Sequence, residues 1–276
     1  MQNSSTRRRT HPRILVDTAH YPIENPKSGA YKDVVSTACQ SFTQSGSISL
    51  PGFLSTEGVE QLQEEARALV PDAVHSTKME NAYGAPADEA MPADHPCRIL
   101  GQTDRHGVAY HQMQDSSLAD LYRWPPLRQL VADVIGHRHL YLHEDPSNAL
   151  VLQIFPEGGR LAWHFDRAGF SCIIQLQAAE EGGEFEYVRA LRSPEDECFD
   201  EVKAVLLGDS TRVERRSAEP GTFSIFNGTR TLHRVTPVRG DRARMSLVLS
   251  YEDRPGVKLD VATRKRFFGP DAPGDD

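Results

Sequence analysis

Apolar residues recur with two different periods along the chain, one before Gly136 and one after it. In STEGVEQLQEEARALVP, apolar side chains recur every three or four positions from Val59 to Leu69, which is the spacing of one helix face, and Pro71 ends the pattern. A second helical pattern covers DSSLADLYRW and PPLRQLVADVIG; the pair Pro125-Pro126 interrupts it and Gly136 is a suitable C-terminal stop. Residues 53–136 are therefore predicted to be mainly helical.

Short β-rich runs follow Gly136, separated by turns that contain Gly or Pro. The runs are LYLH, ALVLQIF, LAWHF, FSCIIQLQ, EFEYV, TFSIF, TLHRVTPV and RMSLVLSY, and the breaks include PEGG, EEGG, EPG and VRGD. Many short strands at close spacing are typical of a β-sandwich or barrel. The pattern predicts an α+β fold, in which N-terminal helices pack on an antiparallel β core over residues 137–256 and a C-terminal segment, 257–276, follows.

The first 45 residues lack a clear period and are rich in Ser, Thr, Pro and Arg. They are interpreted as a tail and a loosely held lead-in, and the basic run Arg7-Arg8-Arg9 as a solvated part of that tail. ISLPGFL predicts a short strand and turn, and the Pro-containing stretch 82–95 predicts a loop. Residues 46–276 are accordingly predicted to form a single domain.

Composition narrows the function classes. A hydrophobic fraction of 38% over 276 residues can bury a substantial core. The formal net charge of −8 argues against a nucleic-acid partner, because an acidic surface repels phosphate backbones. No long apolar stretch supports a signal peptide or a membrane anchor. The four cysteines are scattered and form no CxxC pair, which fits a reduced, cytoplasmic protein better than a disulfide framework or a structural zinc site; they are Cys39, Cys97, Cys172 and Cys198.

The segment LAWHFDRAGF sets His164 and Asp166 two positions apart. Alternate side chains of a strand share a face, so these two point one way, while Trp163 and Phe165 point the other way and are expected to pack outside the cavity. Taken alone, the pair is also compatible with a simple histidine–carboxylate hydrogen bond. A distant histidine on another strand, His233 in TRTLHRVTPV, would complete the layout of the 2-His-1-carboxylate triad that binds Fe(II).

The strand RMSLVLSY offers an anchor for an acid. By alternation, Arg244, Ser246 and Ser250 share a face. An arginine and a serine directed inward can bind a carboxylate through charge-assisted hydrogen bonds. Arg242 lies next to a turn and is expected in water, but it is the alternative anchor if the register is shifted by two residues.

Together, WHFD, the EEGGEF turn, EPGTFSIFNG and HRVTPVRGDRARMSLVLSYEDRPG resemble the Fe(II)/2-oxoglutarate-dependent oxygenases. Within them, the segments are most similar to the branch of small amino-acid hydroxylases and related free-amino-acid halogenases. The resemblance covers residues 148–256 and extends more loosely to NAYGAPADEAMPADHP. It implies a double-stranded β-helix core, the jelly-roll or cupin-like fold. It also implies that Fe(II) is bound by His164, Asp166 and His233, and that Arg244, helped by Ser246, holds the distal carboxylate of 2-oxoglutarate.

The implied reaction converts 2-oxoglutarate and O2 to succinate and CO2 while a C–H bond of a free amino acid or a small derivative is hydroxylated. The halogenases of this branch have glycine at the position of Asp166, so that halide can take the vacated place. The presence of Asp166 favours hydroxylation, or a related oxidation such as desaturation or cyclisation.

Two other functions remain open at this stage. The same triad could bind zinc or manganese in a cupin-like isomerase or hydrolase, although Arg244 would then have no clear purpose. A non-catalytic jelly roll that senses a small acid is a further alternative, which the complete set of ligands and anchor disfavours. Candidates for substrate contact, from the segments expected to close the mouth of the core, are Arg98, Tyr110, His111, Arg167, Ser250 and Phe268. The oligomeric state, the substrate and the carbon attacked are left open.

Overall fold

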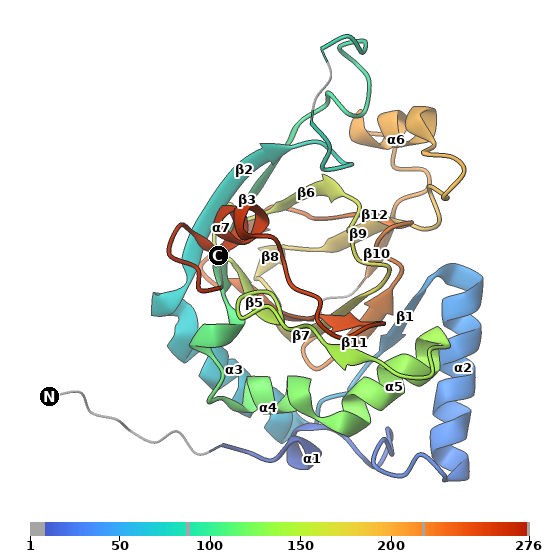
Figure 1. The fold of residues 1–276 in the computed structure, drawn as a ribbon, viewed down its shortest axis with the longest axis vertical. Coiled ribbons are helices and arrows are strands. Elements are labelled where there is room, and N and C mark those ends of the chain that lie inside the picture. Colours follow the sequence, from blue (N-terminus) through green and yellow to red (C-terminus); the bar gives the residue numbers. More distant parts are fainter. Residues whose placement is uncertain (1–8, 87–88, 217–218, 275–276) are drawn as a thin grey trace, which may run out of the picture.

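The computed structural model describes residues 9–86, 89–216 and 219–274. Two antiparallel sheets face each other, and helices cover the outside of the larger one (Figure 1). This is the antiparallel core with packed helices that the sequence predicted. The two basic residues Arg7 and Arg8 lie outside the described part of the chain.

The larger sheet has the strand order β1-β11-β7-β14-β5-β3-β2. Its strands are β1 (Ser47–Leu50), β2 (Val74–Glu80), β3 (Gly101–Val108), β5 (Leu150–Phe155), β7 (Ser171–Gln177), β11 (Phe223–Phe226) and β14 (Arg244–Leu249). The smaller sheet has the order β10-β9-β12-β6, with β6 (Leu161–His164), β9 (Phe185–Val188), β10 (Glu214–Arg216) and β12 (Leu232–Val235). Two short pairs complete the strands: β4 (Tyr141–Leu142) with β15 (Tyr251–Glu252), and β8 (Glu181–Gly182) with β13 (Val238–Arg239).

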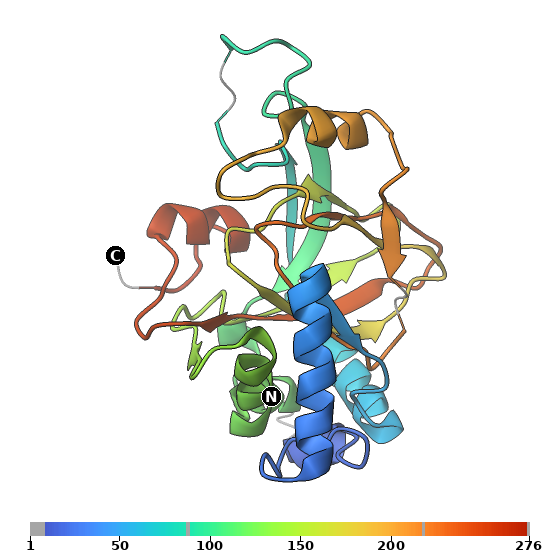
Figure 2. The ribbon, with the colours of Figure 1, turned by 90° about the vertical axis from the view of Figure 1, so that its right-hand side faces the viewer.

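The helices gather mainly on one side of the β core (Figures 1 and 2). They are α1 (Pro12–Leu15), α2 (Gly29–Ser45), α3 (Thr56–Leu69), α4 (Ser117–Arg123), α5 (Pro125–Ile135), α6 (Phe199–Leu206) and α7 (Val261–Phe268), with single 3-10 turns at Val70–Asp72 and Tyr110–Gln112. The Ser55 side chain caps the start of α3, and Gly136 ends α5 in the left-handed conformation with φ 77°. Among the described residues, no helix has both the length and the apolar character needed to span a membrane.

Strand alternation in the larger sheet separates a packing face from a chemical face. On β14, Met245, Leu247 and Leu249 belong to the main hydrophobic core, together with Leu118 of α4 and further residues of α3 and α5. The intervening Arg244 and Ser246 therefore point to the opposite face, toward the smaller sheet. Burial of the apolar face against the helices thus fixes which side chains enter the space between the two sheets.

Two segments differ from the sequence-based prediction. Residues 29–45 are not a loosely held lead-in, because they form α2, in which Tyr31 donates a 2.5 Å hydrogen bond to Asp133 of α5. Only Tyr31 and Ala38 of α2 are buried, so the sequence carries little apolar periodicity there. In addition, β2 and β3 lie inside the stretch predicted to be helical. Their buried or half-buried positions include Lys78 and Arg105, so the usual alternation of apolar and polar residues is missing.

Candidate metal centre

The pairing of β12 with β6 places His233 directly opposite His164. Residues paired in this way lie on the same face of the sheet, and the two imidazole ring centroids are 4.1 Å apart. Asp166 follows β6 on the same side. Trp163 and Phe165 alternate with these residues and point away: Phe165 is buried in a separate apolar cluster, and the guanidinium of Arg234 lies 4.7 Å from the Trp163 ring.

The three side chains offer three donor atoms to one point. Oδ1 of Asp166 lies 3.4 Å from Nε2 of His164 and 3.6 Å from Nε2 of His233. One ligand atom from each residue lies within 4.8 Å of the other two. Bonds of about 2.1 Å to a shared ion separate two ligands at right angles by about 3 Å, so a small contraction would complete a facial site. The residues present therefore fit a divalent metal with two neutral imidazoles and one carboxylate.

Hydrogen bonds orient the three candidate ligands. Nδ1 of His164 lies 2.9 Å from the carbonyl oxygen of Ala162, and Nδ1 of His233 lies 2.9 Å from that of Thr231. A backbone carbonyl can only accept, so each Nδ1 carries the proton and the lone pair of each neutral ring is on Nε2. Ser171 donates to Oδ2 of Asp166 at 2.5 Å, which leaves Oδ1 for the ion.

Electrostatics keep Asp166 ionised. Burial by itself would raise the pKa of this carboxyl, but attraction to the nearby His233 and His164 and the hydrogen bond from Ser171 outweigh burial and hold the pKa well below its usual range. Burial and the neighbouring His164 lower the pKa of His233 to about 4, which keeps that ring neutral. For His164, hydrogen bonding and attraction to Asp166 outweigh burial and raise the pKa.

Arg244 is a buried cation with no counter-ion among the described residues. Its exposed fraction is 3%, and no carboxylate of the described residues lies within 4.0 Å of it. One nitrogen, Nη1, donates to Oγ of Ser246 at 3.0 Å, whereas Nε is buried with no hydrogen-bond partner in the described part of the chain. Burial lowers the pKa of Arg244 to about 10. A buried charge in this state calls for an anionic ligand.

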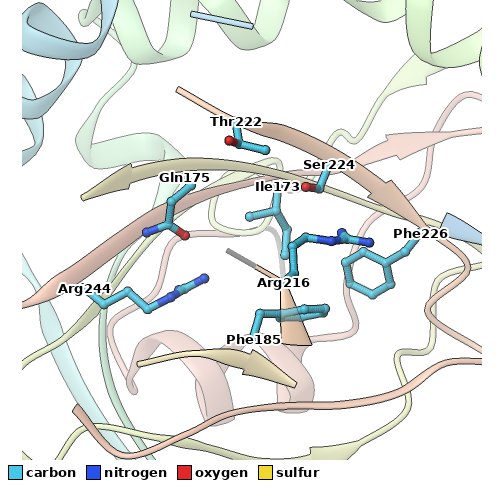
Figure 3. Close-up of a pocket in the computed structure, with 8 residues that line it drawn as sticks. All are labelled: Ile173, Gln175, Phe185, Arg216, Thr222, Ser224, Phe226 and Arg244. Atoms are coloured by element: carbon cyan, nitrogen blue, oxygen red, sulfur yellow. The ribbon is translucent and has the colours of Figure 1, made fainter. Parts of the chain in front are cut away.

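The head of Arg244 enters a cavity between the two sheets (Figure 3). Arg216 of β10 also reaches it, and the other lining residues are Ile173, Gln175, Phe185, Thr222, Ser224 and Phe226. Phe185 and Phe226 pack against the His233 ring, with centroid distances of 5.5 and 5.0 Å, so the cavity adjoins the candidate metal centre. Arg242, the alternative anchor, is exposed and donates to the carbonyl oxygen of Ala179 at 3.1 Å.

Three of the predicted substrate residues are engaged in the scaffold. Arg98 donates to the carbonyl oxygen of Met91 at 2.6 Å and so ties its own loop. Ser250 donates to the carbonyl oxygen of Asn148 at 2.9 Å. Tyr110 lies 3.2 Å from Nη1 of Arg123. The structure gives each of these polar groups a protein partner, so none of them requires a ligand.

The other three predicted substrate residues have different surroundings. His111 is exposed in the 3-10 turn Tyr110–Gln112. Arg167 is also exposed, but it directly follows Asp166 in the chain. Phe268, at the end of α7, is buried with Ala109 of the segment after β3 and Val151 of β5. Of the six residues, only Arg167 is adjacent in sequence to a candidate ligand.

A charged group on β2 and β3 was not predicted from the sequence. Lys78 and Glu80 form an ion pair of 2.9 Å. Arg105 is 8% exposed, and its side chain makes no hydrogen bond or ion pair to any described residue. The negative charge of Glu80 contributes to the raised pKa of His164, so this carboxylate lies near the candidate metal centre. The sequence signal was charge at alternate positions, Lys78 and Glu80, in a segment interpreted as helical.

Comparisons with known proteins identify a matching family. A family model described as Halogenase D matches residues 30–266. No curated protein sequence matches the chain.

Solved structures share the fold at low sequence identity. An oxidoreductase of the 2OG-Fe(II) oxygenase family from Burkholderia pseudomallei is 16% identical, with a TM-score of 0.52 over 81% of this chain and 92% of its own. AviO1 from Streptomyces viridochromogenes Tue57 is 18% identical, with a TM-score of 0.56 over 80% of this chain and 96% of its own. SnoK, a non-heme alpha-ketoglutarate-dependent carbocyclase of nogalamycin biosynthesis, is 16% identical, with a TM-score of 0.56 over 87% of this chain and 93% of its own. These likenesses show a common fold.

Proposed function

Because this chain belongs to the Halogenase D family, within the Fe(II)/2-oxoglutarate-dependent oxygenases, we propose that it hydroxylates an unactivated C–H bond of a free amino acid or a small amino-acid-derived metabolite. Bound Fe(II) supplies the activation of O2, which is coupled to conversion of 2-oxoglutarate to succinate and CO2. The observation that carries the proposal is the convergence of two Nε2 atoms and one carboxylate oxygen beside a cavity that holds an unpaired buried arginine.

The chain's own residues have separate tasks in this proposal. Nε2 of His164, Oδ1 of Asp166 and Nε2 of His233 would hold the metal, and three protein ligands would leave it free to bind co-substrate and O2. Arg244 binds the distal carboxylate of 2-oxoglutarate, and Ser246 orients the guanidinium through its 3.0 Å hydrogen bond. The fully buried position of Ser246 keeps bulk water away from that carboxylate.

Charges near the centre support a small zwitterionic substrate. Lys78, Glu80 and Arg105 present both signs of charge on neighbouring strands, β2 and β3. A free amino acid also carries both signs, so such a group can bind its ammonium and carboxylate ends. Arg167 remains a further candidate because it follows Asp166 and is not hydrogen-bonded to any described residue.

Asp166 supports hydroxylation over halogenation, because a carboxylate occupies the place that halide takes in the related halogenases. Its Oδ1 atom is turned to the two imidazoles and its Oδ2 atom is held by Ser171. Other oxidations remain alternatives in the same site, since SnoK, which shares the fold, is a carbocyclase. The reaction outcome therefore has to be read from the product.

The proposal is tested on anaerobic full-length protein loaded with Fe(II). Addition of 2-oxoglutarate is expected to give a metal-to-ligand charge-transfer absorption band. O2 is then admitted, and a panel of amino acids is screened for stimulated succinate release. Mass spectrometry of the stimulating amino acid should show the gain of one oxygen atom; loss of two hydrogens would indicate desaturation or cyclisation. Metal binding with no charge-transfer band and no turnover of 2-oxoglutarate would favour a cupin-like isomerase, hydrolase or sensor instead.

Two variants check the residue assignments. Asp166→Ala should abolish hydroxylation, while Arg244→Ala should raise the required 2-oxoglutarate concentration at least tenfold, which is the loss of one charge-assisted interaction. Arg242→Ala is the matched control, because this arginine lies nearby but is exposed. If the control and not Arg244→Ala changed the 2-oxoglutarate requirement, the anchor would be reassigned to Arg242.

The cellular setting is part of the proposal. All four cysteines are free, and a chain with unpaired, scattered cysteines suits a reducing compartment. We therefore infer a cytoplasmic enzyme of amino-acid metabolism whose partner is a small molecule.

A further inference from the structure

A second arginine, Arg216, lines the same cavity as Arg244 (Figure 3). It is the last residue of β10, the edge strand of the smaller sheet. Its guanidinium reaches across to β1, the edge strand of the larger sheet, and donates a hydrogen bond to Oγ of Ser47. Arg216 therefore closes one side of the space between the sheets and contributes a second positive charge to it.

Arg216 has no close counter-ion in the described part of the chain. Within the described ranges, no carboxylate lies within 4.0 Å of its guanidinium, whereas the neighbouring Arg215 pairs with Glu186 at 2.9 Å. The Arg216 guanidinium donates to Oγ of Ser47 and also has a hydrogen-bonding contact with the Tyr187 side chain, which raises the pKa of Arg216 against the effect of burial. A guanidinium carries five N–H donors, so most of those on Arg216 are free for a ligand.

Arg216 lies on the metal side of the cavity. Its Cζ atom is 5.6 Å from the ring of Phe185, and that ring is 5.5 Å from the imidazole of His233. Arg244, by contrast, is joined to Ser246 on β14 and stacks at 5.5 Å over Phe155 of β5.

We propose that Arg216 is a second co-substrate-binding residue, which binds the carboxylate at the keto end of 2-oxoglutarate while Arg244 binds the distal carboxylate. The inference rests on the proposed function and deepens it. Two guanidinium groups in one cavity match a ligand with two carboxylates, since each supplies planar paired donors for a carboxylate. Because Arg216 binds the keto end, it contributes equally to the affinity for 2-oxo acids with and without a distal carboxylate.

The alternative is a purely structural role, in which Arg216 only bridges the edges of the two sheets through Ser47. Such a bridge would contribute to the stability of the fold but not to the affinity for an anion. The two roles are separated by measuring affinity and thermal stability on the same variants.

The experiment is an anaerobic titration of Fe(II)-loaded full-length protein, followed by its charge-transfer absorption. Two ligands are compared: 2-oxoglutarate, and 2-oxopentanoate, which has the same chain but lacks the distal carboxylate. The variants are Arg216→Met and Arg244→Met. Arg215→Met is the matched control, because Arg215 precedes Arg216 on the same strand and its side chain is 66% exposed. Its partner Glu186 would still be paired with Arg234 in this variant.

Arg216→Met is expected to lower the affinity for both ligands by a similar factor of at least ten. Arg244→Met should lower the affinity for 2-oxoglutarate by at least the same factor and leave the affinity for 2-oxopentanoate within about threefold of wild type. The control should bind both ligands as the wild type does. If Arg216→Met lowered the affinity for 2-oxoglutarate but not for 2-oxopentanoate, the assignment of Arg216 to the keto end would be overturned. Wild-type affinity for both ligands with a lower melting temperature would overturn it in favour of the bridge.

Two further outcomes are distinguishable. A wild-type protein that binds Fe(II) but gives no band with 2-oxoglutarate would refute the proposed function itself, before any Arg216 variant is considered. If Arg216→Met does not yield folded protein, Arg216→Gln replaces it, because its amide can still donate to Ser47 while the charge is removed. Unchanged affinity of Arg216→Gln for both ligands would then overturn the inference, and a loss of at least tenfold would support it.

Discussion

Ser171 donates a 2.5 Å hydrogen bond to Oδ2 of Asp166 and thereby turns Oδ1 of that carboxylate toward the two histidines. Ser171 begins β7 in the larger sheet, whereas Asp166 follows β6 in the smaller one. This bond therefore links the candidate metal centre to the strand that also lines the neighbouring cavity through Ile173. An outer hydrogen bond of this kind holds a metal ligand in one orientation.

Replacement of Ser171 should lower the affinity for Fe(II). Ser171→Ala frees Oδ2, so Asp166 can rotate, and we expect the Fe(II) affinity to fall about 10- to 100-fold. The measurement is competition with a chromophoric chelator under anaerobic conditions. Ser41→Ala, on the exposed part of α2, is the control and should bind as the wild type does. Equal affinities for both variants would show that Asp166 is oriented by the two histidines alone.

Gly228 leaves room for the Asp166 side chain. A Cβ atom at this position would lie 2.4 Å from Oδ2 and 2.6 Å from Cβ of Asp166, and the Gly228 carbonyl already accepts from the Asp166 amide at 2.9 Å. Gly228→Ala should displace the carboxylate and lower the Fe(II) affinity at least about tenfold.

Gly29→Ala provides the comparison for that variant. Gly29 is the first residue of α2 and a Cβ there would meet nothing within 4 Å, so metal affinity and stability should be retained. The same chelator competition serves for both glycines. Full Fe(II) affinity in Gly228→Ala would mean that the loop after β11 yields without moving Asp166.

A buried ion pair anchors the C-terminal helix. Nε of Arg264 in α7 lies 2.9 Å from Oδ2 of Asp145, and the two side chains are 4% and 0% exposed. Arg264→Met leaves Asp145 as an uncompensated buried charge, so we expect unfolding to be easier by about 3–5 kcal/mol at pH 7. Lys265→Met, on the exposed side of α7, should change little. Urea unfolding measures the difference, and hydrogen exchange should rise first in α7.

The same pair gives the protein an acid-sensitive contribution to stability. Burial alone would raise the pKa of Asp145, but hydrogen bonds from Ser147 and Arg264 outweigh burial and lower it. A group whose pKa is lowered in the folded state stabilises the fold above its unfolded pKa of about 3.9, and this contribution is lost as pH falls through the folded value. The gap in unfolding free energy between wild type and Arg264→Met should therefore shrink below pH 4. A gap that is constant from pH 7 to pH 3 would rule out this linkage.

Arg105 offers a way to separate substrate binding from co-substrate binding. It lies on β3 near the charge of Glu80, and its side chain has no hydrogen bond and no ion pair within 4.0 Å in the described ranges. We expect Arg105→Met to raise the amino-acid concentration for half-maximal succinate release at least about tenfold, while the charge-transfer band with 2-oxoglutarate stays unchanged. Gln102→Met, outward on the same strand, is the control. A weakened band in Arg105→Met would place this arginine in the co-substrate pocket instead.

The sequence by itself determined the chemistry that is available and the strands that carry it. His164 and Asp166 share a face because of the strand period, and Arg244 and Ser246 alternate with core residues that had to pack on the helices. The helical period of α3, and the breaks at Pro125 and Gly136, were likewise readable from local pattern. These features depend on neighbours within a few residues.

Only the tertiary structure decided which distant groups meet. The register that sets His233 opposite His164, the bond from Ser171 to Asp166 and the space at Gly228 join segments far apart in the chain. Arg216 and the charged residues of β2 and β3 were not found in advance, because buried polar positions that line a cavity break the alternation of apolar and polar residues by which strands are predicted. Local pattern fixes the face to which a side chain belongs, whereas strand pairing across the core fixes its partners.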